Sequence, residues 1–320
     1  MLQASSRSSR HRFLLVAFAS LVLGCATVKP PAATALLPTQ HQTRTGPYCV
    51  FTNAAMPPDA PAIRSLQSLE RQLEATLGIR VPPGTEPIEV YILESPEAFR
   101  HFLMFYFPEL PTRRAFFLAQ GTRRVVYTYQ GGRLEEDLRH EATHALLHAA
   151  APELPLWLDE GLAEYFEGDE ARDGLNAEHL AHLPDDFESG FIPDLKRLES
   201  LRDVRKMTPR DYRESWAWVH YLLNGPASGK AALLSFLADQ RGEGDPSPLS
   251  RRLIVTDSDP AIRLISHVEH TREASLAAAR ALREREPTVR FQDRAEDVAP
   301  VPPQGKRRSF FGRITGLFGM

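Results

Sequence analysis

The sequence predicts an α+β fold: a small mixed N-terminal sheet with an edge hairpin, packed on a pair of helices and followed by a mostly helical C-terminal lobe. Strand-length apolar runs alternate with helical segments in the first half, and two helical segments joined by a Pro-containing turn occupy the middle. Ala, Leu and Arg dominate the last part at helical spacing. With 320 residues, 42% of them hydrophobic, the chain can bury a substantial core.

The first half carries the predicted sheet. Its apolar runs have strand length, and its helical segments place apolar residues at i, i+3 and i+4. The aromatic stripe of the second helix is expected to pack in the core, with a wall facing a substrate as the alternative. The expected strands are 48–52, 88–93, 115–118 and 124–129, and the expected helices are 61–77 and 96–107.

The N-terminus is expected to be a targeting segment. Residues 1–24 have a basic start and an apolar stretch that is short for a membrane span. The stretch ends in L-V-L-G-C, which resembles a bacterial lipobox, so Cys25 is expected to be lipidated and to tether the chain to a membrane. An ordinary signal peptide cut near Ala26 is the alternative. The predicted location is the cell envelope of a bacterium, at the outer membrane and facing the periplasm.

The amino-acid composition divides the rest of the chain into a tether, a folded domain and a tail. Residues 25–46 are rich in Pro, Ala, Thr and Gln and are expected to form a flexible tether. The folded domain is expected to span 47–285, with a sheet lobe at 47–130, a helix pair at 133–168 and a helical lobe at 195–285. The Pro-rich tail 286–320 is expected to be disordered, and its basic, aromatic end either lies on an anionic membrane or stays unstructured.

The helix pair carries the strongest chemical signal. His140, Glu141 and His144 form an H-E-x-x-H motif. Residues four apart share one helix face, so the two imidazoles can bind one Zn²⁺ while Glu141 lies beside them to act on a water molecule. The plainer alternative is a helix with two surface histidines. The helical apolar stripe of this segment and the second helix that follows it argue against that alternative.

A third ligand is available on the second helix. Catalytic zinc commonly has three protein ligands and one open position, and His₂Glu is a frequent set. In the segment W-L-D-E-G-L-A-E-Y-F, Glu160 is placed to complete the set, whereas Asp159 points about 100° away on a helical wheel. Glu164 lies one turn beyond Glu160 and could orient a ligand histidine from behind.

The H-E-A-T-H motif followed by W-L-D-E-G-L-A-E-Y-F resembles the gluzincin metallopeptidases, most of all the bacterial peptidase MA-like families. The resemblance implies His140, His144 and Glu160 as zinc ligands and Glu141 as general base. The spacing from histidine to glutamate is shorter here than in the thermolysin-like and aminopeptidase branches.

The same resemblance suggests two further roles. In gluzincins an edge strand before the active helix binds the substrate backbone, and the matching segment is 125–129. A tyrosine at the start of a later helix steadies the oxyanion, and the matching residue is Tyr212, which follows the helix-start signal Thr208-Pro209. A core position is the alternative for Tyr212, and His220 and Tyr221 are the other candidates for the oxyanion role.

Other histidines are expected to have lesser roles. His148 is one turn too far to share the metal and is expected at the surface or as a cap. Residues 167–197 are polar and are expected to be an irregular flap. His179 and His182 within them lack a clear third partner for a second metal.

The sequence therefore predicts a membrane-tethered, zinc-dependent enzyme that hydrolyses peptide bonds in a peptide or protein. Cell-wall peptide bridges are an alternative substrate, and a catalytically inactive envelope binding or scaffold lipoprotein is the alternative function. A formal net charge of −3 and the lack of a basic stripe with aromatics in the body of the chain argue against nucleic acid as a partner. Aminopeptidase activity is not supported, because no G-x-M-E-N-type segment precedes the helix.

Overall fold

The computed structural model describes residues 36–242, 247–256 and 258–285 and confirms the α+β class. The predicted signal peptide 1–24, the lipidated Cys25 and the tail 286–320 lie outside these residues. The elements in chain order are β1 (His41–Thr45), β2 (Tyr48–Thr52), α1 (Pro61–Leu77), β3 (Ile88–Leu93), α2 (Pro96–Tyr106), β4 (Phe116–Gln120), β5 (Arg123–Tyr129), α3 (Leu134–Ala150), α4 (Leu156–Phe166), η2 (Glu170–Arg172), α5 (Ala177–Glu188), α6 (Leu195–Glu199), η3 (Val204–Lys206), α7 (Pro209–Asn224), α8 (Ala227–Gln240), α9 (Leu249–Thr256) and α10 (Pro260–Arg285).

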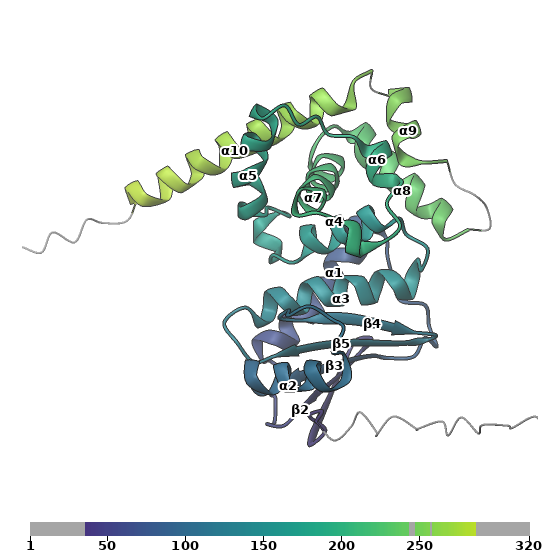
Figure 1. Cartoon of the computed structure of the whole chain (residues 1–320), viewed down its shortest axis with the longest axis vertical. Coiled ribbons are helices and arrows are strands. Elements are labelled where there is room, and N and C mark those ends of the chain that lie inside the picture. The colour runs from purple at the N-terminus through teal and green to yellow at the C-terminus, as the bar shows by residue number, and fades with distance from the viewer. Residues whose placement is uncertain (1–35, 243–246, 257, 286–320) are drawn as a thin grey trace, which may run out of the picture. The chain divides into compact units, whose positions relative to one another are not determined.

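The five strands form one mixed sheet in the order β1-β2-β3-β5-β4. The central pairs β2–β3 and β3–β5 are parallel, and the outer pairs β1–β2 and β4–β5 are antiparallel. Successive side chains of a strand point to opposite faces. Val90 and Val126 therefore join the core beneath α1 and α3, whereas Tyr91 and Tyr127 join the core beneath α2. Figure 1 shows α3 on one face of the sheet and α2 on the other.

Local signals explain where the main helices begin and end. Pro61 opens α1, and the helix stops at Gly78, whose φ of 64° is open to glycine at little cost. The start of α7 is a capping box: the Thr208 hydroxyl accepts from the Asp211 N–H, and the Asp211 carboxylate accepts from the Thr208 N–H. Helix α1 has the bounds that the sequence predicts, and α7 begins where the sequence predicts.

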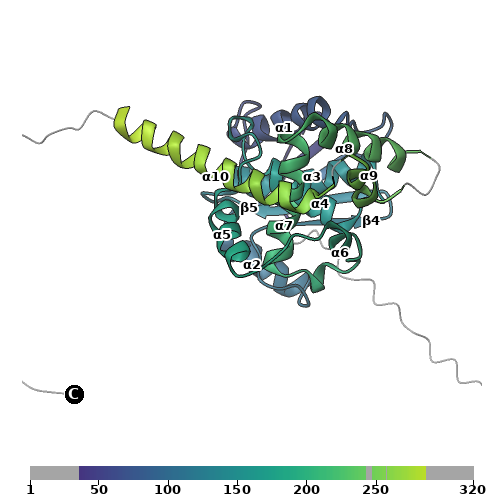
Figure 2. The ribbon, with the colours of Figure 1, turned by 90° about the horizontal axis from the view of Figure 1, so that it is seen from above.

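The second half of the chain adds helices to the outer side of α3. A short loop follows α3 and lets α4 pack back against it, and α7 packs against α4 in turn. These helices lie side by side in both views (Figure 1, Figure 2). The chain divides into two compact units, Met1–Glu273 and Ala274–Met320, and α10 runs across that division. Among the described residues, no helix combines the length and apolarity that a membrane crossing needs.

Two predicted irregular segments contain regular structure. The tether was expected to reach residue 46, but residues 41–45 form β1, and the preceding Leu37 is buried in the core beneath α2. The sequence H-Q-T-R-T hides this strand, because an edge strand with mostly exposed side chains needs no apolar pattern. The expected irregular flap 167–197 contains α5 and the start of α6, with Leu180 and Leu183 buried.

The prediction that residues 125–129 form the edge strand is wrong. Residues 125–129 belong to β5, which pairs with β3 on one side and β4 on the other, so it is an internal strand. Val125, Val126, Tyr127 and Thr128 are buried rather than half-exposed. The edge strand of the hairpin is β4. Strand order depends on pairings between distant segments, which the pattern within one strand does not encode.

Candidate metal centre

Helix α3 presents two histidines on the side away from the sheet. Leu138, Ala142 and Ala145 bury the opposite side of α3 in the core, so the residues between them are turned towards α4. His140 and His144 are four residues apart, and their ring centroids are 5.1 Å apart. Their side chains are 21% and 9% exposed, so both rings are largely withdrawn from water.

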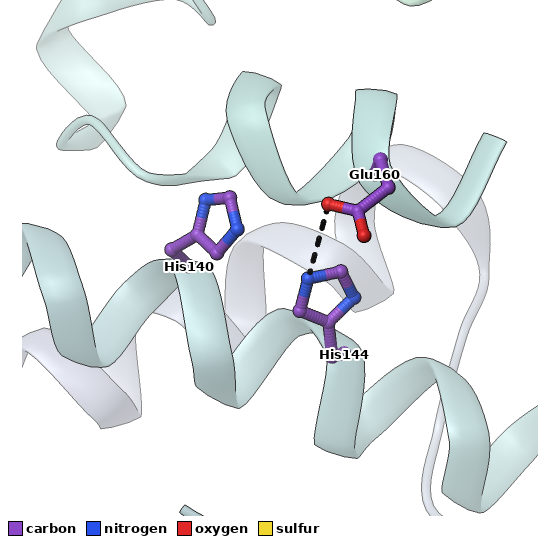
Figure 3. Close-up of side chains that lie close together, drawn as sticks. All are labelled: His140, His144 and Glu160. Atoms are coloured by element: carbon purple, nitrogen blue, oxygen red, sulfur yellow. Dashed lines mark ion pairs between the residues drawn. The ribbon is translucent and has the colours of Figure 1, made fainter. Parts of the chain in front are cut away.

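Helix α4 brings a carboxylate to the same point. Its Trp157, Leu158 and Leu162 are fully buried, which turns Glu160 towards α3. The Glu160 Oε2 atom lies 3.7 Å from Nε2 of His144. One ligand atom from each of His140, His144 and Glu160 lies within 4.8 Å of the others, and Figure 3 shows the three side chains converging between the two helices. The three residues can therefore hold one divalent metal ion.

Gly161, which follows Glu160, explains how a third helix comes close. A Cβ atom at Gly161 would lie 2.6 Å from the backbone oxygen of Ser215 and 2.9 Å from a methyl group of Val219, both in α7. Real Cβ atoms essentially never come so near to backbone. The missing side chain therefore permits the close packing of α7, which carries Tyr212, against the helix that carries Glu160.

Two carboxylates hold the far sides of the histidine rings. Asp159 Oδ2 lies 2.9 Å from Nδ1 of His144, and Glu167 Oε2 lies 3.3 Å from Nδ1 of His140. A carboxylate at Nδ1 fixes the ring and leaves Nε2 free to bind a metal. Asp159 thus lies outside the group of three donors and orients the His144 ring.

Glu164 lies behind the site with different partners from those expected. A carboxylate oxygen of Glu164 lies within 4.8 Å of potential ligand atoms of His140 and Glu167. The Oε2 atom of Glu164 accepts a hydrogen bond from Asn176 and lies 3.0 Å from Nε2 of His179. The Asn176 amide also donates to Glu167, at 2.9 Å. The residues that hydrogen-bond the two ligand histidines are Asp159 and Glu167, so the expected role of Glu164 falls to its neighbours.

These charges change the acidity of the site. Burial alone would lower the pKa of His140, but the hydrogen bond to Glu167 and the nearby negative charges outweigh burial and raise the pKa to about 10. Burial alone would also lower the pKa of His144. The charge of Asp159 and its hydrogen bond outweigh burial and raise the pKa of His144 to about 9. Burial also raises the pKa of Glu160. Asp159 is buried too, but His144 and His148 hold its pKa well below the ordinary value.

Glu141 and Tyr212 are the two predicted catalytic residues near this group. Glu141 is half-buried, follows His140 directly, and forms no hydrogen bond or ion pair within the described part of the chain. Tyr212 is half-buried at the start of α7. Burial raises the pKa of Tyr212 to about 12, and the negative charge of Glu160 is the next cause, which places the phenol within electrostatic range of the carboxylate. Tyr212 can therefore donate a hydrogen bond towards the site at neutral pH.

The other oxyanion candidates have partners elsewhere. His220 is buried, and its Nδ1 lies 2.8 Å from Nε2 of His267 in α10. The Tyr221 ring packs against the same His267 and against Trp218. These contacts direct both side chains towards α10, whereas the charge of Glu160 acts on Tyr212.

Of the remaining histidines, His148 is half-buried, with Nε2 3.6 Å from Asp159 and its ring against Phe117. His182 is exposed on α5. The sequence interpretation missed Asp159 as an orienting residue, and it missed Glu167 entirely. Glu167 is seven residues after Glu160, two turns along the same helix face, and this spacing could have indicated it. Asn176 had no such signal, because it reaches the site from a separate helix start.

Comparison of the chain with protein-family models and with curated proteins gave no match.

Proposed function

We propose that this protein is a zinc-dependent peptidase that hydrolyses peptide bonds in peptide or protein substrates. The observation that carries the proposal is the convergence of His140, His144 and Glu160 beside Glu141. A histidine pair with a carboxylate is a frequent ligand set of catalytic zinc. The H-E-x-x-H motif and the segment W-L-D-E-G-L-A agree with the gluzincin resemblance.

One donor separation supports the choice of zinc. Two ligands each about 2.0–2.1 Å from a tetrahedral zinc lie roughly 3.4 Å apart. The distance of 3.7 Å between His144 Nε2 and Glu160 Oε2 is close to that value. Both histidines also have a carboxylate on Nδ1, which leaves the other ring nitrogen for the ion. Three protein ligands leave one position open for water or substrate.

In the proposed mechanism, bound Zn²⁺ supplies Lewis acidity, which lowers the pKa of water and polarises a carbonyl group. Glu141 accepts the proton of the attacking water and delivers it to the leaving amine. Tyr212 donates its phenolic hydrogen to the carbonyl oxygen as negative charge develops there. Asp159 and Glu167 keep the ligand rings in position through the reaction.

The edge strand β4 is the proposed support for the substrate backbone. Phe117 of β4 packs against the rings of His144 and His148, with ring centroids 6.3 Å and 5.1 Å apart, so the strand runs beside the metal ligands. One side of β4 pairs with β5, and β4 ends the order of the described sheet. A peptide added as a further strand would satisfy its backbone amides without dependence on its sequence.

The proposed location follows from the N-terminus alone. A lipidated Cys25 would hold the enzyme at a bacterial envelope membrane, facing the periplasm. Its support is the L-V-L-G-C sequence, which lies outside the described residues.

Three variants of the purified protein test the proposal, with metal content measured by mass spectrometry and cleavage measured on a peptide library. Wild type should hold one zinc per chain and cleave. Glu141→Gln should keep the zinc and lose cleavage, whereas Glu160→Gln should lose the zinc. Tyr212→Phe should bind peptides normally and turn over on the order of a hundredfold more slowly. Glu153→Gln, an exposed glutamate, is the matched control.

Undiminished cleavage by Glu141→Gln would refute the mechanism. Zinc binding without cleavage of any peptide by wild type would favour the inactive scaffold protein.

A further inference from the structure

A pocket of about 280 Å³ lies between α2 and the segment that leads into β4. Its floor is apolar: Phe99 and Leu103 of α2 are buried there, and Phe107 packs beside them. The pocket therefore has an apolar floor on the sheet face opposite α3, and none of the candidate metal ligands lines it.

The rim of this pocket is positively charged. Arg100, Arg113 and Arg114 line it, and its lining includes no Asp or Glu. Arg114 is held by Asp137 of α3, with Nε donating to Oδ1 at 2.9 Å. Arg100 and Arg113 are exposed, and within the described part of the chain neither forms an ion pair. Guanidinium groups bind carboxylates through paired hydrogen bonds, so the pocket is suited to a carboxylate on a short apolar stem.

The pocket is connected to the candidate metal centre by its rim. The bond from Arg114 to Asp137 joins the rim to α3 three residues before His140. Burial raises the pKa of Tyr212, and the positive charge of Arg113 acts in the opposite direction. Arg113 is therefore within electrostatic range of the Tyr212 phenol. Arg113 and Arg114 thus belong both to the rim of the pocket and to the surroundings of the candidate metal centre.

The segment that leads into β4 sets the distance. Phe117 lies beside His144, and Arg113 precedes it by four residues. Four residues span at most about 13 Å, and the chain bends at Arg114. A peptide paired along β4 would therefore reach the pocket with a residue a few positions from the cleaved bond.

We infer that the pocket between α2 and the segment that leads into β4 binds a carboxylate of the substrate, so that the enzyme prefers peptides with an acidic group a few residues from the cleaved bond. The inference rests on the proposed peptidase function. Two sources share this chemistry, a glutamate side chain within the peptide and the free C-terminal carboxylate.

Binding can be measured without turnover in the zinc-loaded Glu141→Gln protein. The probes are fluorescent decapeptides of one sequence, amidated at the C-terminus, with glutamate replacing glutamine at one position at a time. A second set carries the free C-terminal acid and no glutamate. Fluorescence anisotropy gives the dissociation constants at about 50 mM and about 500 mM salt, because screening weakens exposed charge pairs.

In one of the two sets, we expect one acidic peptide to bind about tenfold more tightly at low salt than the neutral peptide of the same sequence. A tenfold change in the dissociation constant corresponds to the free energy of one charge-assisted hydrogen bond. Adding Arg113→Gln or Arg100→Gln should remove most of the preference, whereas adding Arg44→Gln, an exposed arginine of β1, should keep it. Thermal melts of each variant check folding. The set that shows the preference identifies the source of the carboxylate.

Equal binding of every acidic and neutral pair would overturn the inference, and so would an unchanged preference in both Arg113→Gln and Arg100→Gln. A failure of the peptidase proposal would give a different result from a failure of this inference. Wild type would then cleave no peptide, while the acidic preference in binding, and its loss with Arg113, would persist.

Discussion

Zinc uptake by the metal-free protein should release about two protons per ion near pH 7. An imidazolium has no lone pair for a metal, so each protonated ligand must lose its proton first. The neighbouring carboxylates raise the pKa of His140 to about 10 and that of His144 to about 9. At pH 7 both rings are then protonated in about 99% or more of the metal-free molecules.

Isothermal titration calorimetry in buffers of different protonation enthalpy measures the number of protons released. The apparent zinc affinity should also rise by about two powers of ten per pH unit from about pH 6.5 to about pH 8, below both pKa values. Asp159→Asn provides the matched perturbation. Without the Asp159 charge, burial lowers the pKa of His144, and the number of protons released at pH 7 should fall towards one. Asp185→Asn, an exposed residue of α5, should leave it unchanged.

Release of less than one proton by wild type would refute the reasoning, because the carboxylates would then not set the protonation of the ligands. The same number of protons from wild type and Asp159→Asn would show that Asp159 does not act through His144.

Two further predictions concern folding. Gly161→Ala should lower the free energy of unfolding by about 1–3 kcal/mol and reduce zinc content, because the new methyl group would displace α7 from α4. Thermal melts and metal analysis check this against Gly132→Ala, whose Cβ meets no atom within 4 Å, and equal stability of both variants would contradict it. Burial, reinforced by His267, lowers the pKa of His220 to about 3, so between pH 6.5 and 3 the unfolded chain binds a proton that the folded chain does not. Stability should therefore fall as pH drops below about 6.5, by about 2 kcal/mol at pH 5. His220→Phe should remove this loss in urea unfolding at pH 5 and 7, and an unchanged pH dependence would count against it.

The local part of the fold was predictable because its causes are local. The helix bounds at Pro61, Gly78 and Thr208 follow from residue types that act on their own backbone. The spacing of His140 and His144 is likewise a property of one helix. Glu160 was predictable as a ligand candidate because only a short turn separates its helix from theirs.

The partners behind the metal ligands were not predictable in the same way. The helical wheel separates Asp159 from Glu160, but the bond from Asp159 to His144 depends on how α4 rotates against α3. Asn176 and His179 reach Glu164 from α5, a helix that the sequence pattern did not indicate. These contacts arise from packing between separate segments, which helical periodicity cannot register.

By itself, the sequence determined the α+β class, the helix that carries the histidine pair and the three donors of the candidate metal centre, because each depends on spacing within a few turns of chain. Only the tertiary structure decided that β4 and not β5 is the edge strand, that Asp159 and Glu167 hold the histidine rings, and that three arginines line a pocket beside α2. Those features depend on which distant segments pack together, and that choice is made by the free energy of the whole core.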